Sequence, residues 1–231
     1  MPITNKKQWK KLLAKAHKGD SEAQWEVGSY YDDGLELQSG KVIVKPRPKK
    51  AFKWFSSSAS QGNESAQLAL GNILSTGIGT KRDFPKAIYW TKKAIEQGSA
   101  SGTHNLGTIY RDLQKPKLSF KWYTESVKMG NYDSLLQIGL CHLFGYGTIQ
   151  NYVSAQRAFE KIFSNEAPDT CERTKEDAQY WLSIINLLEL NNKKSSLKKA
   201  RKLLESANID NDHEQANELL NVIGKTKYLQ T

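Results

Sequence analysis

One helical pattern recurs along the whole chain, and this internal repeat restricts the possible folds more than any other feature. Its clearest marker is an aliphatic residue followed by glycine, with a degenerate last copy in which serine replaces the glycine. The five copies are Val27-Gly28, Leu70-Gly71, Leu106-Gly107, Ile138-Gly139 and Leu182-Ser183. They are separated by roughly 43, 36, 32 and 44 residues, and such periods are typical of helical solenoids. A unit of this length is a helix pair that cannot bury its apolar face alone, so the copies must stack on one another.

The best preserved copy, residues 63–98, shows what each unit contains. Its first helix carries Leu70 and Leu74 on one face, and a Gly-x-Gly segment at 77–79 interrupts the chain before a second helix. The second helix places Ala87, Trp90 and Ala94 on one face, and its tryptophan recurs at positions 54 and 122. We expect the glycine of each first helix to allow close approach of two helix backbones. We expect the tryptophan opposite to supply a large buried apolar area.

The repeat predicts an all-α protein, folded as a right-handed α-solenoid of about five helix-turn-helix repeats with terminal capping helices. We expect a single continuous array with about twelve helices and almost no sheet. The predicted segments are an N-terminal capping helix at 1–20, repeats at 21–62, 63–98, 99–130, 131–165 and 175–208, and a C-terminal capping helix at 209–231.

The loop of the first repeat, residues 34–48, is unusually long. Val42-Ile43-Val44 favours an extended backbone, and Pro46 and Pro48 disfavour a helix there. Long loops in compact arrays are usually functional or disordered. The sequence therefore predicts a strand-like finger that protrudes from the first repeat.

The complete pattern resembles the Sel-one-like repeat family, whose members are relatives of the tetratricopeptide repeat proteins. The matching residues are Ala23, Gly28, Tyr31, Gly34, Ala51, Trp54 and Gly62, then Ala66, Leu70, Gly71, Gly77, Gly79, Ala87, Trp90, Ala94 and Gly98, then Leu106, Gly107, Tyr110, Trp122 and Gly130. The chain departs from the family pattern in its expanded first loop, its shortened third loop and its eroded fifth repeat. The resemblance implies scaffolding, adaptor or signalling roles, and in bacteria also neutralisation of delivered toxins by cytoplasmic immunity proteins.

No arrangement of residues predicts a catalytic, metal or cofactor site. The four histidines, at positions 17, 104, 142 and 213, lie in different repeats without ligand spacing. The HExxH, CxxC and GxxxxGK[ST] motifs are absent. Some members of the family that the chain resembles have been linked to penicillin binding or β-lactam hydrolysis, so a β-lactam or cell-wall hydrolase is one alternative. We expect instead that the chain is not an enzyme and needs no cofactor.

The apolar residues are too dispersed for a membrane span, because no run of 18 apolar residues occurs. The lysine-rich N-terminus lacks the apolar core of a secretory signal. Two cysteines, Cys141 and Cys171, are too few for a disulfide framework and are expected to be free thiols. These features favour a cytoplasmic location.

The net charge of +10 is compatible with an acidic protein partner, a nucleic acid or an anionic surface. The basic residues form three clusters, namely Lys6, Lys7, Lys10 and Lys11; Lys45, Arg47, Lys49, Lys50 and Lys53; and Lys193, Lys194, Lys198, Lys199, Arg201 and Lys202. We interpret them mainly as solvated outer faces. Binding of a nucleic acid would require the clusters to converge beside exposed aromatic residues.

The candidate binding surface is the concave wall that the first helices of such repeats line. The positions opposite the Ala66/Leu70 face mix aromatic, polar and charged residues, which suits a protein or peptide ligand. They are Trp25, Ser29 and Asp32; Leu68, Asn72 and Ser75; His104, Thr108 and Arg111; Leu136 and Leu140; and Tyr180. We therefore expect a non-enzymatic interaction module that holds an acidic toxin, signalling protein or other protein partner, in an adaptor or immunity role.

Overall fold

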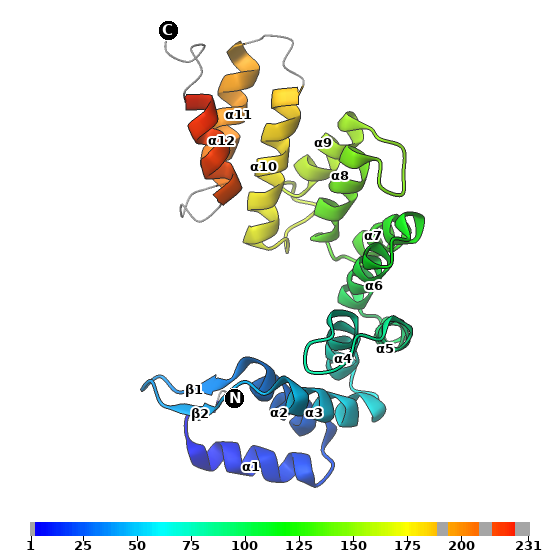
Figure 1. The fold of residues 1–231 in the computed structure, drawn as a ribbon, viewed down its shortest axis with the longest axis vertical. Coiled ribbons are helices and arrows are strands. Elements are labelled where there is room, and N and C mark those ends of the chain that lie inside the picture. Colours follow the sequence, from blue (N-terminus) through cyan, green and yellow to red (C-terminus); the bar gives the residue numbers. More distant parts are fainter. Residues whose placement is uncertain (1–2, 189–193, 208–213, 225–231) are drawn as a thin grey trace. The chain divides into compact units, whose positions relative to one another are not determined.

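The computed structural model describes residues 3–188, 194–207 and 214–224 of the chain. The chain divides into two compact units, an N-terminal unit (1–114) and a C-terminal unit (115–231). The N-terminal unit contains α1 (Lys6–His17), α2 (Ser21–Asp33), β1 (Leu35–Glu36), β2 (Val42–Val44), α3 (Pro48–Ser60), α4 (Glu64–Thr76), α5 (Phe84–Glu96) and α6 (Ala100–Asp112) (Figure 1). The C-terminal unit contains α7 (Pro116–Lys128), α8 (Ser134–Phe144), α9 (Tyr152–Lys161), α10 (Glu172–Leu188), α11 (Lys194–Ala207) and α12 (Glu214–Gly224).

These elements confirm the predicted all-α solenoid of helix pairs. Helices α2 and α3 form the first pair, α4 and α5 the second, α8 and α9 the fourth, and α10 and α11 the fifth. The boundary between the two units falls in the predicted third repeat, between α6 and α7. Of the predicted C-terminal capping segment, α12 is described, whereas 209–213 and 225–231 lie outside the described residues.

The helices begin where local capping groups allow them to begin. Asp20, Asn63 and Ser99 cap the first helices of three repeats, each accepting a hydrogen bond from the backbone N–H three residues on, at 2.8, 2.9 and 3.2 Å. Pro48 and Pro116 occupy the first turn of second helices, where a missing N–H costs nothing. Helix α10, the first helix of the fifth repeat, begins at Glu172. At the start of this helix, the Cys171 carbonyl accepts a hydrogen bond from the Lys175 backbone N–H at 3.2 Å.

The finger predicted in the first repeat is an antiparallel β-hairpin. Strand β1 pairs with β2 so that Leu35 lies opposite Val44 (Figure 1). Both side chains are buried in a cluster that also contains Trp9, Ala23 and Val27, so the base of the hairpin extends the core between α1 and α2. Val42, nearer the tip, is exposed.

The glycines of the first helices allow close packing, as predicted, and the side chain that faces each of them is not that of the tryptophan. A Cβ atom added at Gly28 would meet the Phe55 ring, and one added at Gly139 would meet the Phe159 ring. At Gly71 the added atom would meet Thr91. In the first two repeats, the side chain that faces the glycine therefore belongs to the residue directly after the tryptophan, at positions 55 and 91. Trp54 and Trp90 are half-buried and pack against the core clusters of the N-terminal unit.

A network of glutamines, which the sequence analysis missed, joins successive helices of the N-terminal unit. The buried Gln24 amide donates to the Ala16 carbonyl at 3.0 Å and accepts from Gln61 at 2.7 Å. One repeat later, the buried Gln67 donates to the Ala59 carbonyl at 3.3 Å and accepts from Gln97 at 2.9 Å. Each network ties a first helix both to the helix before it and to the end of the second helix that follows it.

Replacing Gln67 by alanine should lower the free energy of unfolding by about 1 to 2 kcal/mol, because the Gln97 amide loses a partner and the Ala59 carbonyl loses a donor. Urea unfolding followed by circular dichroism measures this change. Gln156→Ala is the control, since the Gln156 amide donates a hydrogen bond to Glu160, one turn away on the same helix, and it should cost less than about 0.5 kcal/mol. Equal effects of the two substitutions would contradict a stabilising role for the network.

Candidate functional site

In the N-terminal unit, most of the predicted surface residues are accessible on the first helices α2, α4 and α6. Asn72 and Arg111 are exposed, whereas Ser75 is buried and donates a hydrogen bond to the Asn72 carbonyl at 2.8 Å. The half-buried members are Trp25, Ser29, Asp32, Leu68, His104 and Thr108. Burial of Ser75 removes it from the surface that we consider further.

In the C-terminal unit, the predicted surface residues take part in packing. Leu136 is buried in the core between α8, α9 and α10, and Leu140 packs against the same core. Tyr180 packs against the cluster formed by Leu204, Ala207 and Ala216. The mixed surface expected from the sequence is therefore best developed on α2, α4 and α6.

Asp32 is the acidic member of this surface. Partial burial raises the pKa of the Asp32 carboxyl above its ordinary value, and the neighbouring charge of Asp33 raises it further. A cationic group placed beside Asp32 would offset both effects.

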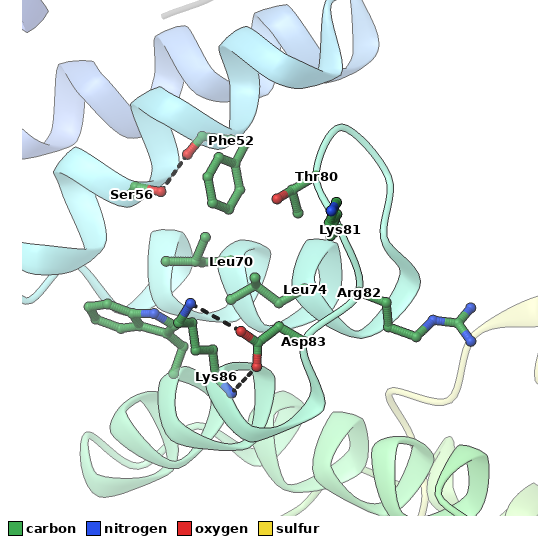
Figure 2. Close-up of a pocket in the computed structure, with 10 residues that line it drawn as sticks. Phe52, Ser56, Leu70, Leu74, Thr80, Lys81, Arg82, Asp83 and Lys86 are labelled. Carbon is green, nitrogen blue, oxygen red and sulfur yellow. Dashed lines mark hydrogen bonds and ion pairs between the residues drawn. The ribbon is translucent and has the colours of Figure 1, made fainter.

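A groove that the sequence analysis did not predict lies between α3, α4 and α5 (Figure 2). It has a volume of about 430 Å³. Phe52 of α3 points toward Leu70 and Leu74 of α4, which form its apolar floor, and the loop carrying Thr80 and Lys81 borders one side (Figure 2). Trp90 also lines the groove.

The rim of this groove is basic. Lys81, Arg82 and Lys86 line it together with one carboxylate, Asp83. Asp83 caps α5 by accepting the Lys86 backbone N–H at 3.0 Å, and it forms an ion pair with the Lys86 ammonium at 3.0 Å (Figure 2). These two hydrogen bonds hold the pKa of Asp83 below its ordinary value. The carboxylate is thus already engaged, and Lys81 makes no ion pair with any described residue.

A second groove, of about 500 Å³, lies one repeat earlier between α1, α2 and α3. Its lining includes Lys50, Lys53 and Trp54. The Lys50 ammonium lies 5.2 Å from the centre of the Tyr31 ring, and the His17 ring meets Trp54 edge-on at 5.0 Å. The signal that could have revealed both grooves is a lysine four residues before the second-helix tryptophan, at Lys50/Trp54 and Lys86/Trp90.

The predicted lysine clusters are exposed wherever the structure describes their side chains. The first cluster lies on α1, and the second on the hairpin and α3, where Lys50 and Lys53 border the second groove. The third cluster begins at Lys193, outside the described residues. Lys198, Lys199, Arg201 and Lys202 are exposed on α11, where Arg201 pairs with Glu205 at 2.9 Å.

Other kinds of site receive little support from the described part of the chain. Across residues 3–188, 194–207 and 214–224, no three His, Cys, Asp or Glu side chains come together as a metal site would require. None of the helices in these ranges has the length and apolarity needed to cross a membrane. Cys141 and Cys171 form no disulfide within the described residues, which agrees with the prediction.

The fold and these surfaces define a repeat protein of the α-solenoid class that offers extended surfaces for binding. A family model described as Sel1 repeat matches residues 21–63, 64–99, 102–131, 133–160 and 176–212. The chain belongs to the Sel1 repeat family, which confirms the resemblance found in the sequence. Sel1 repeats mediate protein–protein interactions and are generally non-catalytic scaffolds.

Among curated proteins, the chain is similar to the chitin synthase regulator SKT5 of Malassezia restricta, with 30% identity over 101 residues, 44% of this chain and 7% of that protein. It is also similar to the ERAD-associated E3 ubiquitin-protein ligase component HRD3A of Arabidopsis thaliana, with 32% identity over 113 residues, 47% of this chain and 17% of that protein. The matched region is thus a small part of both relatives.

Two solved structures share the fold. A Sel1 repeat protein from Oxalobacter formigenes has a TM-score of 0.67 and 24% identity, over 89% of this chain and 78% of that one. The protein c5321, a protective antigen of uropathogenic Escherichia coli strains, has a TM-score of 0.66 and 26% identity, over 92% of this chain and 43% of that one.

Proposed function

We propose that this chain is a non-enzymatic interaction module that binds a protein partner on the surface formed by its first helices. One observation carries the proposal. At matched positions of α2, α4 and α6, Asn72 is exposed and Ser29 and Thr108 are half-buried, beside the larger Trp25 and Leu68. A surface that combines an aromatic anchor with adaptable polar groups is typical of protein interfaces.

The chemistry of the partner follows from the charge of the chain. With a net charge of +10, the chain should associate fastest with an acidic protein. Relatives named as a regulator and as a ligase component support a role in which binding, and not catalysis, is the activity. We accordingly favour an adaptor or an inhibitor over the β-lactam or cell-wall hydrolase.

A narrower form of the proposal is an immunity protein that neutralises a toxin in the bacterial cytoplasm. In that role, the toxin would be the acidic partner, and this chain would neutralise it by covering its active surface. Co-expression with the product of the neighbouring gene tests this form. A neighbouring product that is neither toxic alone nor bound by this chain would exclude the immunity role while leaving the adaptor role intact.

The binding surface itself is tested by Asn72→Arg, which places a long cation at the centre of the exposed face of α4. We expect this substitution to weaken partner binding at least tenfold, or by about 1.4 kcal/mol, because the long side chain would hold the partner surface away from α4. Isothermal titration calorimetry with the partner recovered by affinity purification measures the loss.

Ser60→Arg is the matched control, because it adds the same side chain at an exposed position of a second helix, outside this face and both grooves. Its binding should stay within about twofold of the original chain. Unchanged binding by Asn72→Arg, with an unchanged circular dichroism spectrum, would show that the partner occupies another surface.

A further inference from the structure

We propose that the two grooves between successive second helices of the N-terminal unit are docking sites for an acidic peptide segment that carries an apolar anchor side chain. These grooves do not involve Asn72, so they form a second interaction surface, distinct from the one proposed on the first helices.

The apolar part of each groove selects the anchor. In the groove between α3 and α5, Phe52, Leu70, Leu74 and Trp90 surround a space of about 430 Å³. That volume holds one large side chain together with the adjoining backbone, and burying such a side chain typically contributes about 2 kcal/mol. An aromatic or long aliphatic residue is therefore the expected anchor.

The charges at the rim select the residues that flank the anchor. Lys81 is exposed and makes no ion pair with any described residue, and Lys86 forms an ion pair with Asp83. The groove between α1 and α3 presents Lys50 and Lys53, and its lining contains no carboxylate from the described part of the chain. Both rims therefore present an excess of positive charge, and glutamate or aspartate residues beside the anchor complement it.

The recurrence of the same residues indicates a common ligand for the two grooves. Lys50 and Trp54 in the first repeat correspond to Lys86 and Trp90 in the second. In the third repeat, the equivalent of the lysine is Leu118, so the basic–aromatic combination ends with the N-terminal unit. A single acidic chain with two spaced anchors could occupy both sites and gain affinity through the higher effective concentration of the second anchor.

A single-stranded nucleic acid fits the grooves less well than a peptide. Base binding in such proteins depends on aromatic faces that are free to stack. Here Trp54 meets the His17 ring edge-on, and Trp90 meets the Tyr89 ring at 5.1 Å with an interplanar angle of 78°. The groove floor is aliphatic and would leave the polar edges of a base without hydrogen-bond partners.

Fluorescence anisotropy with a labelled glutamate-rich peptide that carries one central phenylalanine tests the proposal. We expect the full chain to bind this peptide with a micromolar dissociation constant, and added salt should weaken the binding. Replacing the phenylalanine by serine, or the glutamates by glutamine, should each weaken binding about tenfold.

On the protein, Lys53→Glu combined with Lys81→Glu should reduce the affinity at least tenfold, because each substitution reverses a charge at one groove. Lys92→Glu is the matched control, since Lys92 is exposed on α5 but lines neither groove, and it should change the affinity by less than about twofold. The Asn72→Arg variant should bind the peptide with unchanged affinity. Peptide binding in the grooves can then be distinguished from partner binding on the surface of the first helices.

Three results would overturn the proposal. The first is an absence of binding to the acidic peptide at concentrations up to about 1 mM. The second is equal affinity of the Lys53→Glu/Lys81→Glu variant and the unmodified chain. The third is tighter binding of a single-stranded oligouridylate of the same charge, which would assign the grooves to nucleic acid.

Discussion

Replacing Gly79 by alanine should lower the free energy of unfolding by about 3 kcal/mol. Gly79 has a φ of +75°, a conformation that L-residues adopt only with strain. A Cβ atom at this position would also lie 2.6 Å from the backbone carbonyl carbon of Pro48 and 2.7 Å from its oxygen. Because the opposing atoms belong to the backbone at the start of α3, neither side of the contact can rotate away.

Gly40→Ala isolates the cost of the backbone conformation from that of the contact. Gly40 has a nearly identical φ of +76°, but an added Cβ would meet only the Glu36 side-chain oxygen at 3.8 Å. This substitution should cost about 1 kcal/mol. The difference between the two variants then measures the packing of the Gly-x-Gly loop of one repeat on the second helix of the repeat before it.

Urea unfolding gives both free energies, and amide hydrogen exchange identifies the helices that lose protection. For Gly79→Ala we expect the loss in α3, α4 and α5, which surround the contact. If Gly79→Ala costs no more than Gly40→Ala, the close approach to Pro48 is not a feature of the folded chain in solution.

The second large effect concerns Gly139 and Phe159, which face one another between α8 and α9. Phe159→Ala should cost about 4 kcal/mol, because this fully buried ring lies at the centre of the C-terminal core. Gly139→Ala should cost about 2 kcal/mol, since the new methyl group would collide with three atoms of the Phe159 ring. In an ordinary helix the same substitution would stabilise by about 1 kcal/mol.

In the Phe159→Ala background, the effect of Gly139→Ala on the free energy of unfolding should change sign. Once Phe159 is alanine, the methyl group at position 139 occupies vacated space, so Gly139→Ala should then stabilise by about 1 kcal/mol. A double-mutant cycle of urea unfolding experiments measures this coupling. A destabilising Gly139→Ala in both backgrounds would mean that another neighbour, and not Phe159, requires the glycine.

Much of the fold could be predicted from the sequence, because its determinants are local. Asn63 and Gly98 mark the ends of the second repeat, and the helices α4 and α5 lie between them as predicted. The period of the repeat correctly indicated stacked helix pairs, and the Val42-Ile43-Val44 run correctly indicated an extended segment. Capping, turn conformation and apolar periodicity are properties of a few adjacent residues.

The sites were predicted less completely, since exposure depends on neighbours in other helices. Ser75 and Asn72 belong to the same predicted surface, yet Ser75 is buried and Asn72 is exposed. Leu136 was assigned to the surface by its register in the repeat, but the packing of α9 and α10 buries it. The grooves were not predicted at all, because each one combines residues from three helices.

The sequence by itself determined that this chain is a Sel1-type array of helix pairs, with the repeat markers at the positions where helices end and backbones meet. Only the tertiary structure decided which residue fits each glycine, which lysines border an apolar groove and which candidate surface residues remain accessible. The physical reason is that helix formation and capping depend on contacts within a few residues, whereas burial and charge complementarity depend on distances between residues of different helices.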